Sequence, residues 1–316
     1  MEAGQKNKDS NLPKATKAPL GVGVKAPSGV GGYFSLIKFA HTVFAMPFAL
    51  IGFFLGLRAM NYETYKSWWF LLILVVLCMV FARSAAMAFN RWLDAEFDKL
   101  NVRTAIREIP SGVITKRKAM TFVVFNCIAF LITTYFINAL CLVLAPVALF
   151  VILFYSYTKR FTPLCHLVLG LGLSLAPIGA YIAVTGRFAI VPVLFSLSVL
   201  FWVSGFDIIY ALQDEDFDRA NNLRSIPSWL GIKKALHVSE YLHLLSFFSL
   251  FAAGVVGHFS WFYWAGIAAF AFFLIYQHRL VNPKDLSKVN KAFFTSNGIA
   301  SVIFGVFVLL DIFVKF

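Results

Sequence analysis

Residues 71–112 read LLILVVLCMVFARSAAMAFNRWLDAEFDKLNVRTAIREIPSG and join an apolar run of membrane length to a polar segment. Nothing in the apolar part breaks a helix, so we expect the helix to continue into the polar part. Asn90, Asp94 and Asp98 lie four residues apart, a spacing that puts side chains on one face of a helix. This first polar island, Asn90–Gly112, therefore predicts an amide and two carboxylates at the end of a membrane helix.

The composition places the chain among membrane proteins. Of its 316 residues, 60% are hydrophobic and 14% are charged, which is too apolar for a soluble chain of this length. Nine apolar runs are long enough, or nearly so, to cross a bilayer: residues 34–57, 67–89, 118–137, 139–157, 164–186, 189–211, 238–257, 260–277 and 294–314. We therefore predict an all-α, multi-pass membrane protein with nine transmembrane helices.

The distribution of basic residues predicts the orientation in the membrane. The formal net charge is +13, and with a cytoplasmic N-terminus the outside segments keep only four basic residues, Arg58, Lys66, Arg187 and Lys315. Because cytoplasmic loops collect Lys and Arg, we expect the N-terminus and the polar island on the cytoplasmic side of the inner membrane. The charge is not gathered on a soluble module, so it does not indicate nucleic-acid binding.

Several features outside the island have structural interpretations. Residues 1–32 are polar and lack an apolar stripe, so we predict a disordered cytoplasmic tail ahead of a transmembrane domain at 33–316. The four cysteines stand singly and form no CxxC pair, so neither a zinc site nor a disulfide framework is predicted. We expect His41 to be a hydrogen-bonded structural residue, and Gly52 and Gly56 to allow close helix packing.

A second polar island repeats the pattern of the first. Residues 207–230, DIIYALQDEDFDRANNLRSIPSWL, contain Asp207, Asp214 and Asp218 at spacings of seven and four, with Tyr210 between them on the same helical face. Both islands contain D-x-x-x-D, then FD followed by a basic residue, then Asn, Arg and IPS. The internal repeat predicts two related halves that meet across a shared pocket.

The two halves, about 33–160 and 161–316, would bring two carboxylate clusters face to face. Facing carboxylates repel one another, so a cation must lie between them. Oxygen ligands from Asp and Asn suit Mg²⁺, which combines a few carboxylates with phosphates, whereas zinc would need a His/Cys cluster. Basic residues interleaved with the acids would bind phosphate oxygens: Arg103, Arg107, Lys159, Arg160 and Arg224. The pattern predicts a magnesium-diphosphate site beside an apolar cavity.

Three motifs carry a resemblance to a known family. NRWLDAEFD (90–98), DIIYALQDEDFD (207–218) and YSYTKR (155–160) are similar to the N-x-x-x-D-x-x-x-D, D-x-x-Y-A-x-x-D-x-x-x-D and Y-x-x-x-K segments of the UbiA superfamily of membrane aromatic prenyltransferases. The flanking ARSAAMAFNR, RTAIREIPSG and FFTSNG also resemble the branch that prenylates quinone precursors. The resemblance runs from residue 34 to the C-terminus.

The resemblance implies nine transmembrane helices around a central cavity with a lateral opening and polar cap loops on the cytoplasmic side. It implies transfer of a polyprenyl group from a polyprenyl diphosphate, through an allyl cation, to a ring carbon of an aromatic acid. 4-Hydroxybenzoate ranks first as acceptor, and a dihydroxynaphthoate of a menaquinone route is the alternative. The implied Mg²⁺ ligands are Asn90, Asp94, Asp98, Asp214 and Asp218, with Lys159, Arg103 and Arg107 steadying the leaving diphosphate.

The roles of two buried charges stay open at this point. Asp207 could stabilise the cation, take the ring proton near Tyr155 or Tyr210, or pair with Arg83. Arg83 could anchor the carboxylate of the acceptor or pair with an acid. Ala40 stands where the quinone-precursor branch has an acid, which puts any role of that acid in doubt.

Other classes of protein fit the pattern less well. A secondary transporter would bind its substrate near the bilayer midplane at broken helices, whereas the acids here gather at one membrane face. A membrane phosphotransferase that joins a nucleotide-activated alcohol to a lipid would need DG and AR within one compact motif, and neither island contains them. A scaffold protein would not explain two matched acidic islands.

Overall fold

The computed structural model describes residues 31, 33, 36, 45–60 and 67–314, and within these it contains helices and their connections without a strand. The predictions for the tail, Ala40 and His41 concern positions outside the described residues. The long helices are α2 (Met46–Ala59), α3 (Trp68–Leu93), α5 (Lys116–Tyr135), α6 (Ala139–Thr158), α7 (Cys165–Thr185), α8 (Ile190–Ala211), α11 (Ile232–Val256), α12 (Trp261–Leu280) and α13 (Asn297–Val314). The short ones are α4 (Ala95–Leu100), η3 (Leu212–Asp214), α9 (Glu215–Ala220), α10 (Ile226–Leu230) and η4 (Lys291–Ser296).

Each of the nine predicted apolar runs overlaps one long helix in the described part of the chain. Seven helical segments there are long and apolar enough to cross a membrane, with α2 and α12 outside this set. The described part of α2 has only 14 residues, and the last turn of α12 carries His278 and Arg279. The all-α, multi-pass membrane class is therefore confirmed, whereas the count of nine membrane spans is not.

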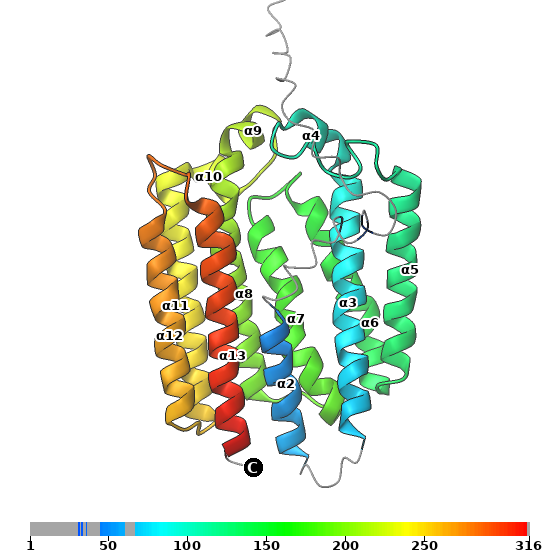
Figure 1. Ribbon diagram of the computed structural model, residues 1–316, viewed down its shortest axis with the longest axis vertical. Helices are drawn as coiled ribbons and strands as arrows, with labels where there is room; N and C mark the ends of the chain where they lie inside the picture. Colours follow the sequence, from blue (N-terminus) through cyan, green and yellow to red (C-terminus); the bar gives the residue numbers. More distant parts are fainter. Residues whose placement is uncertain (1–30, 32, 34–35, 37–44, 61–66, 315–316) are drawn as a thin grey trace, which may run out of the picture.

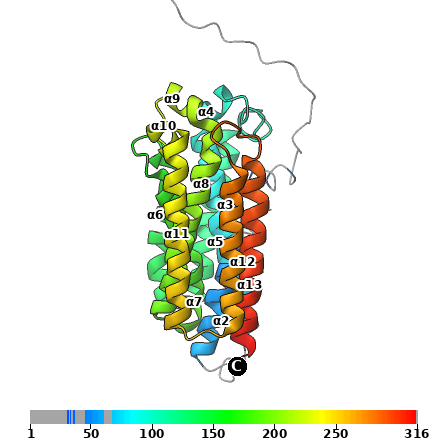
Figure 2. The same cartoon turned by 90° about the vertical axis from the view of Figure 1, so that its left-hand side faces the viewer.

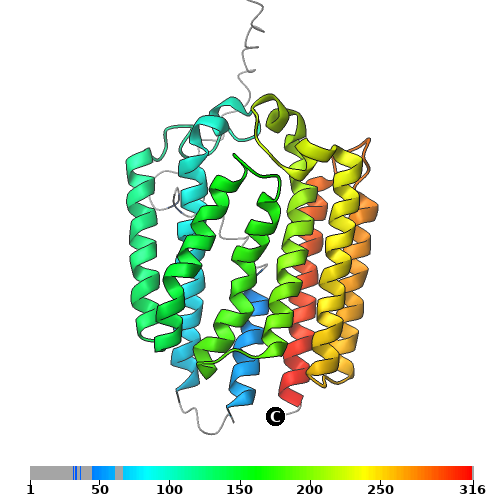
Figure 3. The ribbon, with the colours of Figure 1, turned by 180° about the vertical axis from the view of Figure 1, so that it is seen from behind.

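The long helices run side by side (Figures 1 and 3). α7 packs against α2, α6 and α8, while α3 packs against α5 and α6. α11 packs against α8, α12 against α13, and α13 against α2. The short helices α4, α9 and α10 gather at one end of the bundle (Figure 2), so both polar islands lie at the same end.

Close contact between α2 and α7 depends on glycine. A Cβ atom at Gly52 would lie 2.0 Å from the carbonyl oxygen of Pro177, and one at Gly56 would lie 2.8 Å from Cβ of Val184. Small residues let helix backbones approach closely in membranes, so the predicted packing role of both glycines is confirmed. The four cysteines are free thiols.

Polar side chains join the helices around α8 within an aromatic core. Trp202 is fully buried and donates its indole N–H to the side-chain oxygen of Asn297 at 2.9 Å. The hydroxyls of Ser198 and Ser246 lie 2.8 Å apart between α8 and α11. Buried polar groups require such partners, and these contacts hold α8, which carries the second polar island, in a defined register.

Candidate active site

The first polar island keeps its acids together although α3 ends inside it. α3 stops at Leu93 and α4 starts at Ala95, yet the backbone N–H of Asp94 still donates to Asn90 O (2.9 Å) and that of Asp98 to Asp94 O (2.8 Å). The side-chain amide of Asn90 also donates to the carboxylate of Asp94 at 3.1 Å. The four-residue spacing therefore survives the break between the helices.

The second island is built in the same way from α8, η3 and α9. Asp207 lies in the last two turns of α8, Asp214 ends η3, and Asp218 lies in α9. Asp218 is completely buried and accepts a hydrogen bond from the hydroxyl of Ser225 at 2.9 Å. Because α10 begins just after Ser225, the folded loop shields this carboxylate from solvent.

Each of the four aspartates in the two D-x-x-x-D motifs has its own cation. Asp98 receives both hydrogen bonds from Nη1 of Arg107, at 2.7 and 2.9 Å. The other three ion pairs are Asp94 with Arg160 at 3.0 Å, Asp218 with Lys159 at 2.7 Å, and Asp214 with Arg103. Four carboxylates and four cations therefore balance one another formally at this end of the bundle.

Arg103 connects the two islands directly. Its guanidinium pairs with Asp214 and donates from Nη1 to the hydroxyl of Tyr210 at 2.9 Å. Asn101 adds a hydrogen bond from its amide to Asp214 at 3.1 Å. Side chains from the loop of the first island therefore contact Tyr210 and Asp214 of the second island across the pocket.

Burial and pairing change the ionisation of the groups at the ends of the helices. Burial raises the pKa of Asp94, although Arg160 opposes the change. Burial alone would lower the pKa of Lys159, but its pair with Asp218 outweighs burial and raises the pKa. Burial alone would also lower the pKa of Arg103, but Asp214 and Tyr210 outweigh burial and raise the pKa. Lys159 and Arg103 therefore remain cations at neutral pH.

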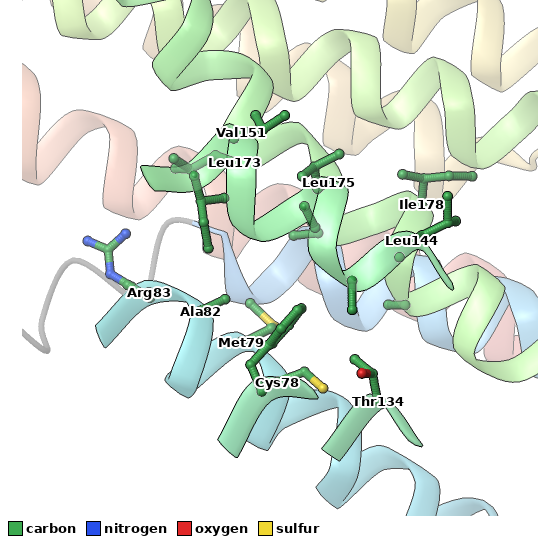
Figure 4. Close-up of a pocket in the computed structure, with 18 of the residues that line it drawn as sticks. Cys78, Met79, Ala82, Arg83, Thr134, Leu144, Val151, Leu173, Leu175 and Ile178 are labelled. Carbon is green, nitrogen blue, oxygen red and sulfur yellow. The ribbon is translucent and has the colours of Figure 1, made fainter. Parts of the chain in front are cut away.

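Two cavities meet at this end of the bundle. A polar cavity of about 280 Å³ is lined by the predicted Mg²⁺ ligands Asn90, Asp94, Asp98, Asp214 and Asp218, and by Arg103, Arg107, Lys159, Arg160, Asp207 and Tyr210. An apolar cavity of about 380 Å³ lies between α3, α5, α6 and α7, and Figure 4 shows Arg83 at its rim beside Ala82. Five residues line both cavities: Arg83, Met87, Tyr155, Leu169 and Leu173. The two cavities are therefore adjacent, with these side chains as their shared wall.

The apolar cavity extends deep into the bundle. Along α6 it is lined from Tyr155 to Cys141, fourteen residues away, which is about 21 Å at 1.5 Å per residue. The hydrocarbon core of a bilayer is about 30 Å thick. An apolar chain that begins at the polar cavity can thus follow α6 through most of the membrane.

Arg83 does not pair with an acid in the described part of the chain. Its Nε is buried there without a hydrogen-bond partner, and among the described residues Asp207 contacts His166, not Arg83. The alternative in which Arg83 and Asp207 neutralise each other is therefore wrong. A buried guanidinium nitrogen without a partner is costly, and Arg83 lines both cavities.

One prediction from the basic residues needs correction, and one residue of the cavity was missed. Arg224 is absent from the lining of the polar cavity and donates from Nη1 to the carbonyl of Phe161 at 2.9 Å, so it is a structural contact. His166, which lines the cavity, was not predicted at all. A single histidine at the start of an apolar run carries no local signal, because its partner Asp207 lies 41 residues further along the chain.

The side chains present fit a divalent cation in their chemistry. Carboxylate and amide oxygens are the ligands that hard cations prefer, and all five predicted ligands line one cavity. Among the residues that the structure describes, however, no three His, Cys, Asp or Glu side chains are gathered closely enough to hold a metal ion. Metal binding would therefore require the carboxylates to exchange their present cations.

The chain is similar to proteins of known family. The UbiA prenyltransferase family matches residues 44–298. The 4-hydroxybenzoate octaprenyltransferase of Aeromonas salmonicida (strain A449) is 32% identical over 239 residues, which cover 75% of this chain and 81% of that protein. The enzyme of the same name from Aliivibrio fischeri (strain MJ11) is 32% identical over 242 residues, covering 75% and 82%.

Solved structures share the fold. The apo structure of a UbiA homolog from Aeropyrum pernix K1 matches with a TM-score of 0.75 and 30% identity, covering 86% of this chain and 98% of that chain. A UbiA homolog from Archaeoglobus fulgidus bound to DMAPP and Mg²⁺ matches with a TM-score of 0.67 and 19% identity, covering 90% and 99%. With paired aspartate motifs at one end of its helical bundle, the chain belongs to the UbiA prenyltransferase family.

Proposed function

We propose that this chain transfers a polyprenyl group from a polyprenyl diphosphate to a ring carbon of an aromatic acid, in the biosynthesis of a respiratory quinone. The observation that carries the proposal is that a polar and an apolar cavity adjoin, with Arg83, Met87 and Tyr155 in the wall of both. A polyprenyl diphosphate is polyanionic at one end and as apolar as lipid at the other. The polar cavity suits the diphosphate of this substrate, and the apolar cavity suits its prenyl chain.

The polar cavity supplies groups for the diphosphate. Asn90, Asp94, Asp98, Asp214 and Asp218 would hold Mg²⁺, which supplies positive charge beside the leaving oxygens when it is bound. Lys159, Arg103, Arg107 and Arg160 would turn from these carboxylates toward the phosphate oxygens. Charge-assisted hydrogen bonds from Arg and Lys to phosphate are among the strongest in proteins.

The chemistry takes place where the cavities join. The C–O bond of the prenyl diphosphate breaks and its electron pair leaves with the diphosphate oxygen, so an allyl cation forms. The ring carbon ortho to the acceptor hydroxyl attacks this cation, and loss of the ring proton restores aromaticity. Tyr155 and Asp207 line the polar cavity beside this junction, and the aromatic face of Tyr155 suits a cation.

Arg83 favours an acceptor with a carboxylate. Its buried Nε has no partner among the residues described, and an aromatic acid would supply one through a charge-assisted hydrogen bond. The names of the relatives rank 4-hydroxybenzoate first, with a dihydroxynaphthoate as the alternative. The excess of Lys and Arg on the same side as both islands supports a cytoplasmic active site in the inner membrane.

The test is a product analysis with purified protein in lipid. The protein is incubated with Mg²⁺, a long-chain polyprenyl diphosphate and, in separate reactions, 4-hydroxybenzoate, a dihydroxynaphthoate or phenol, and products are identified by mass spectrometry. We expect prenylated 4-hydroxybenzoate and little product from phenol, because phenol lacks the carboxylate for Arg83. Prenylation of the naphthoate alone would overturn the choice of acceptor. No prenylated ring from any acceptor would overturn the function.

A further inference from the structure

His166 and Asp207 form a close pair at the wall of the polar cavity. Nδ1 of His166 lies 2.6 Å from Oδ2 of Asp207. The histidine side chain is only 3% exposed, whereas that of Asp207 is 24% exposed. Both residues line the polar cavity. The aspartate therefore faces the cavity, and the histidine supports it from behind.

A second hydrogen bond determines which nitrogen of His166 carries the proton. The backbone N–H of Ile226 donates to Nε2 of His166 at 3.3 Å, so Nε2 presents its lone pair. Nδ1 must then carry the hydrogen in the neutral ring and donate it to Asp207. This hydrogen bond holds Oδ2 in place and so orients the carboxylate of Asp207.

The helices on either side of this pair cannot shift easily. The hydroxyl of Ser204 in α8 donates to the backbone oxygen of His166 in α7 at 3.1 Å. A Cβ atom at Gly170 would lie 2.3 Å from that hydroxyl and 2.4 Å from Leu200 O, so the α7 and α8 backbones are in close contact. Ile226, at the start of α10, completes a three-sided frame around the histidine ring.

In the described part of the chain, Oδ1 of Asp207 has no hydrogen-bond partner, while Oδ2 is occupied by His166. The free oxygen belongs to a residue of the cavity wall, next to the junction where the acceptor ring would lie. A base must lie within hydrogen-bond reach of the proton it removes and must be ionised beforehand. Oδ1 of Asp207 is the oxygen left available for such a contact, because His166 holds Oδ2.

We propose that His166 is a positioning residue for Asp207, holding it as an oriented carboxylate whose free oxygen takes the ring proton after the new C–C bond forms. The inference rests on the proposed function. The electrons of the ring C–H bond restore the aromatic ring, and the proton passes to Oδ1 of Asp207. His166 keeps its own proton throughout and touches neither substrate.

The decisive variants are His166→Leu, which removes the donor, and His166→Asn, whose amide can restore a donor near the position of Nδ1. Ser204→Ala is the matched control, because it removes a hydrogen bond between the same two helices without touching Asp207. Folding of each variant is followed by thermal denaturation. Initial rates are measured with 4-hydroxybenzoate and with 4-hydroxybenzoate deuterated at the ring positions ortho to the hydroxyl.

We expect His166→Leu to lower kcat on the order of 10²-fold, the usual contribution of a general base, with KM for the polyprenyl diphosphate nearly unchanged. The deuterated acceptor should react more slowly than the ordinary one in this variant, since removal of the ring proton has become limiting. His166→Asn should recover most of the lost rate, and Ser204→Ala should keep the wild-type kcat.

Three results would overturn the inference: wild-type kcat in His166→Leu, no recovery in a folded His166→Asn protein, or equal losses in His166→Leu and Ser204→Ala. Failure of the proposed function has a different signature, because the wild-type protein would then prenylate no acceptor at all. In that case the role of His166 is overturned with it.

Discussion

The two polar islands share a motif but satisfy their buried acids differently. Arg107 and Arg224 both stand two residues before IPS, yet Arg107 binds Asp98 with two hydrogen bonds, whereas Arg224 donates to the carbonyl of Phe161. Asp218, the counterpart of Asp98, takes its cation from Lys159 instead. Equivalent residues of a repeat therefore need not have equivalent partners.

Loop length explains the difference. Nine residues separate Asp98 from Arg107, but only six separate Asp218 from Arg224. The shorter loop closes at once, with the N–H of Leu223 donating to Asp218 O at 2.8 Å, and it cannot return an arginine to its own aspartate. Lys159 and Arg160 are adjacent in the chain but pair with different islands. Lys159 pairs with Asp218 of the second island, and Arg160 pairs with Asp94 of the first.

The carboxylates should show the largest effects. Asp94→Asn and Asp214→Asn each remove one charge from one island, and we expect kcat/KM for prenyl transfer to fall on the order of 10²-fold or more, because stabilisation of the leaving group is lost. Steady-state kinetics at several Mg²⁺ concentrations measures this. Thermal denaturation should show both proteins folded. Near-normal activity in both variants would disprove the assignment of the islands to Mg²⁺.

The cations that pair with these acids should show intermediate effects. We expect Arg107→Gln and Lys159→Gln each to raise KM for the polyprenyl diphosphate roughly tenfold, about 1.4 kcal/mol, since each cation would move to phosphate in the proposed complex. Lys159→Gln should also destabilise the protein by about 1–3 kcal/mol, because it leaves the carboxylate of Asp218, which is 0% exposed, without a cation.

A double variant separates the two effects. Lys159→Gln combined with Asp218→Asn removes both charges, so the melting temperature should recover toward the wild-type value while prenyl transfer stays low. A double variant as unstable as Lys159→Gln alone would show that the buried charge is not the cause of the instability.

Arg224 should show the smallest effect, in contrast to its counterpart Arg107. Its guanidinium contacts a backbone carbonyl and lies outside the lining of the polar cavity. We expect Arg224→Gln to change KM for the polyprenyl diphosphate by less than about twofold and the free energy of unfolding by less than about 1 kcal/mol. An increase in KM as large as that of Arg107→Gln would mean that the present ion pairs do not identify the phosphate-binding cations.

Much of the architecture was predictable because it depends on local pattern. Apolar runs predicted where the long helices lie, and four-residue spacing predicted that Asn90, Asp94 and Asp98 stay together across the end of α3. The repeat predicted two islands at one end of the bundle. The predicted number of membrane spans was not confirmed, because α2 and α12 fall outside the seven helical segments that are long and apolar enough to cross a membrane.

The partners of the charged residues were not predictable in the same way. The residue types alone allowed Asp207 to pair with Arg83, but packing of α7 against α8 brings His166 to Asp207 instead. Arg103 meets Asp214 across 111 residues, and Arg160 meets Asp94 across 66. Such contacts depend on how the helices pack and how long the loops are.

The sequence by itself determined the membrane class, the helices, the two polar islands and the family to which the chain belongs, because each rests on composition or on spacing within one segment. Only the tertiary structure decided that the apolar and polar cavities adjoin, that each motif aspartate has its own cation, and that His166 contacts Asp207. The physical reason is that these features join atoms from different helices, and their distances are set by packing.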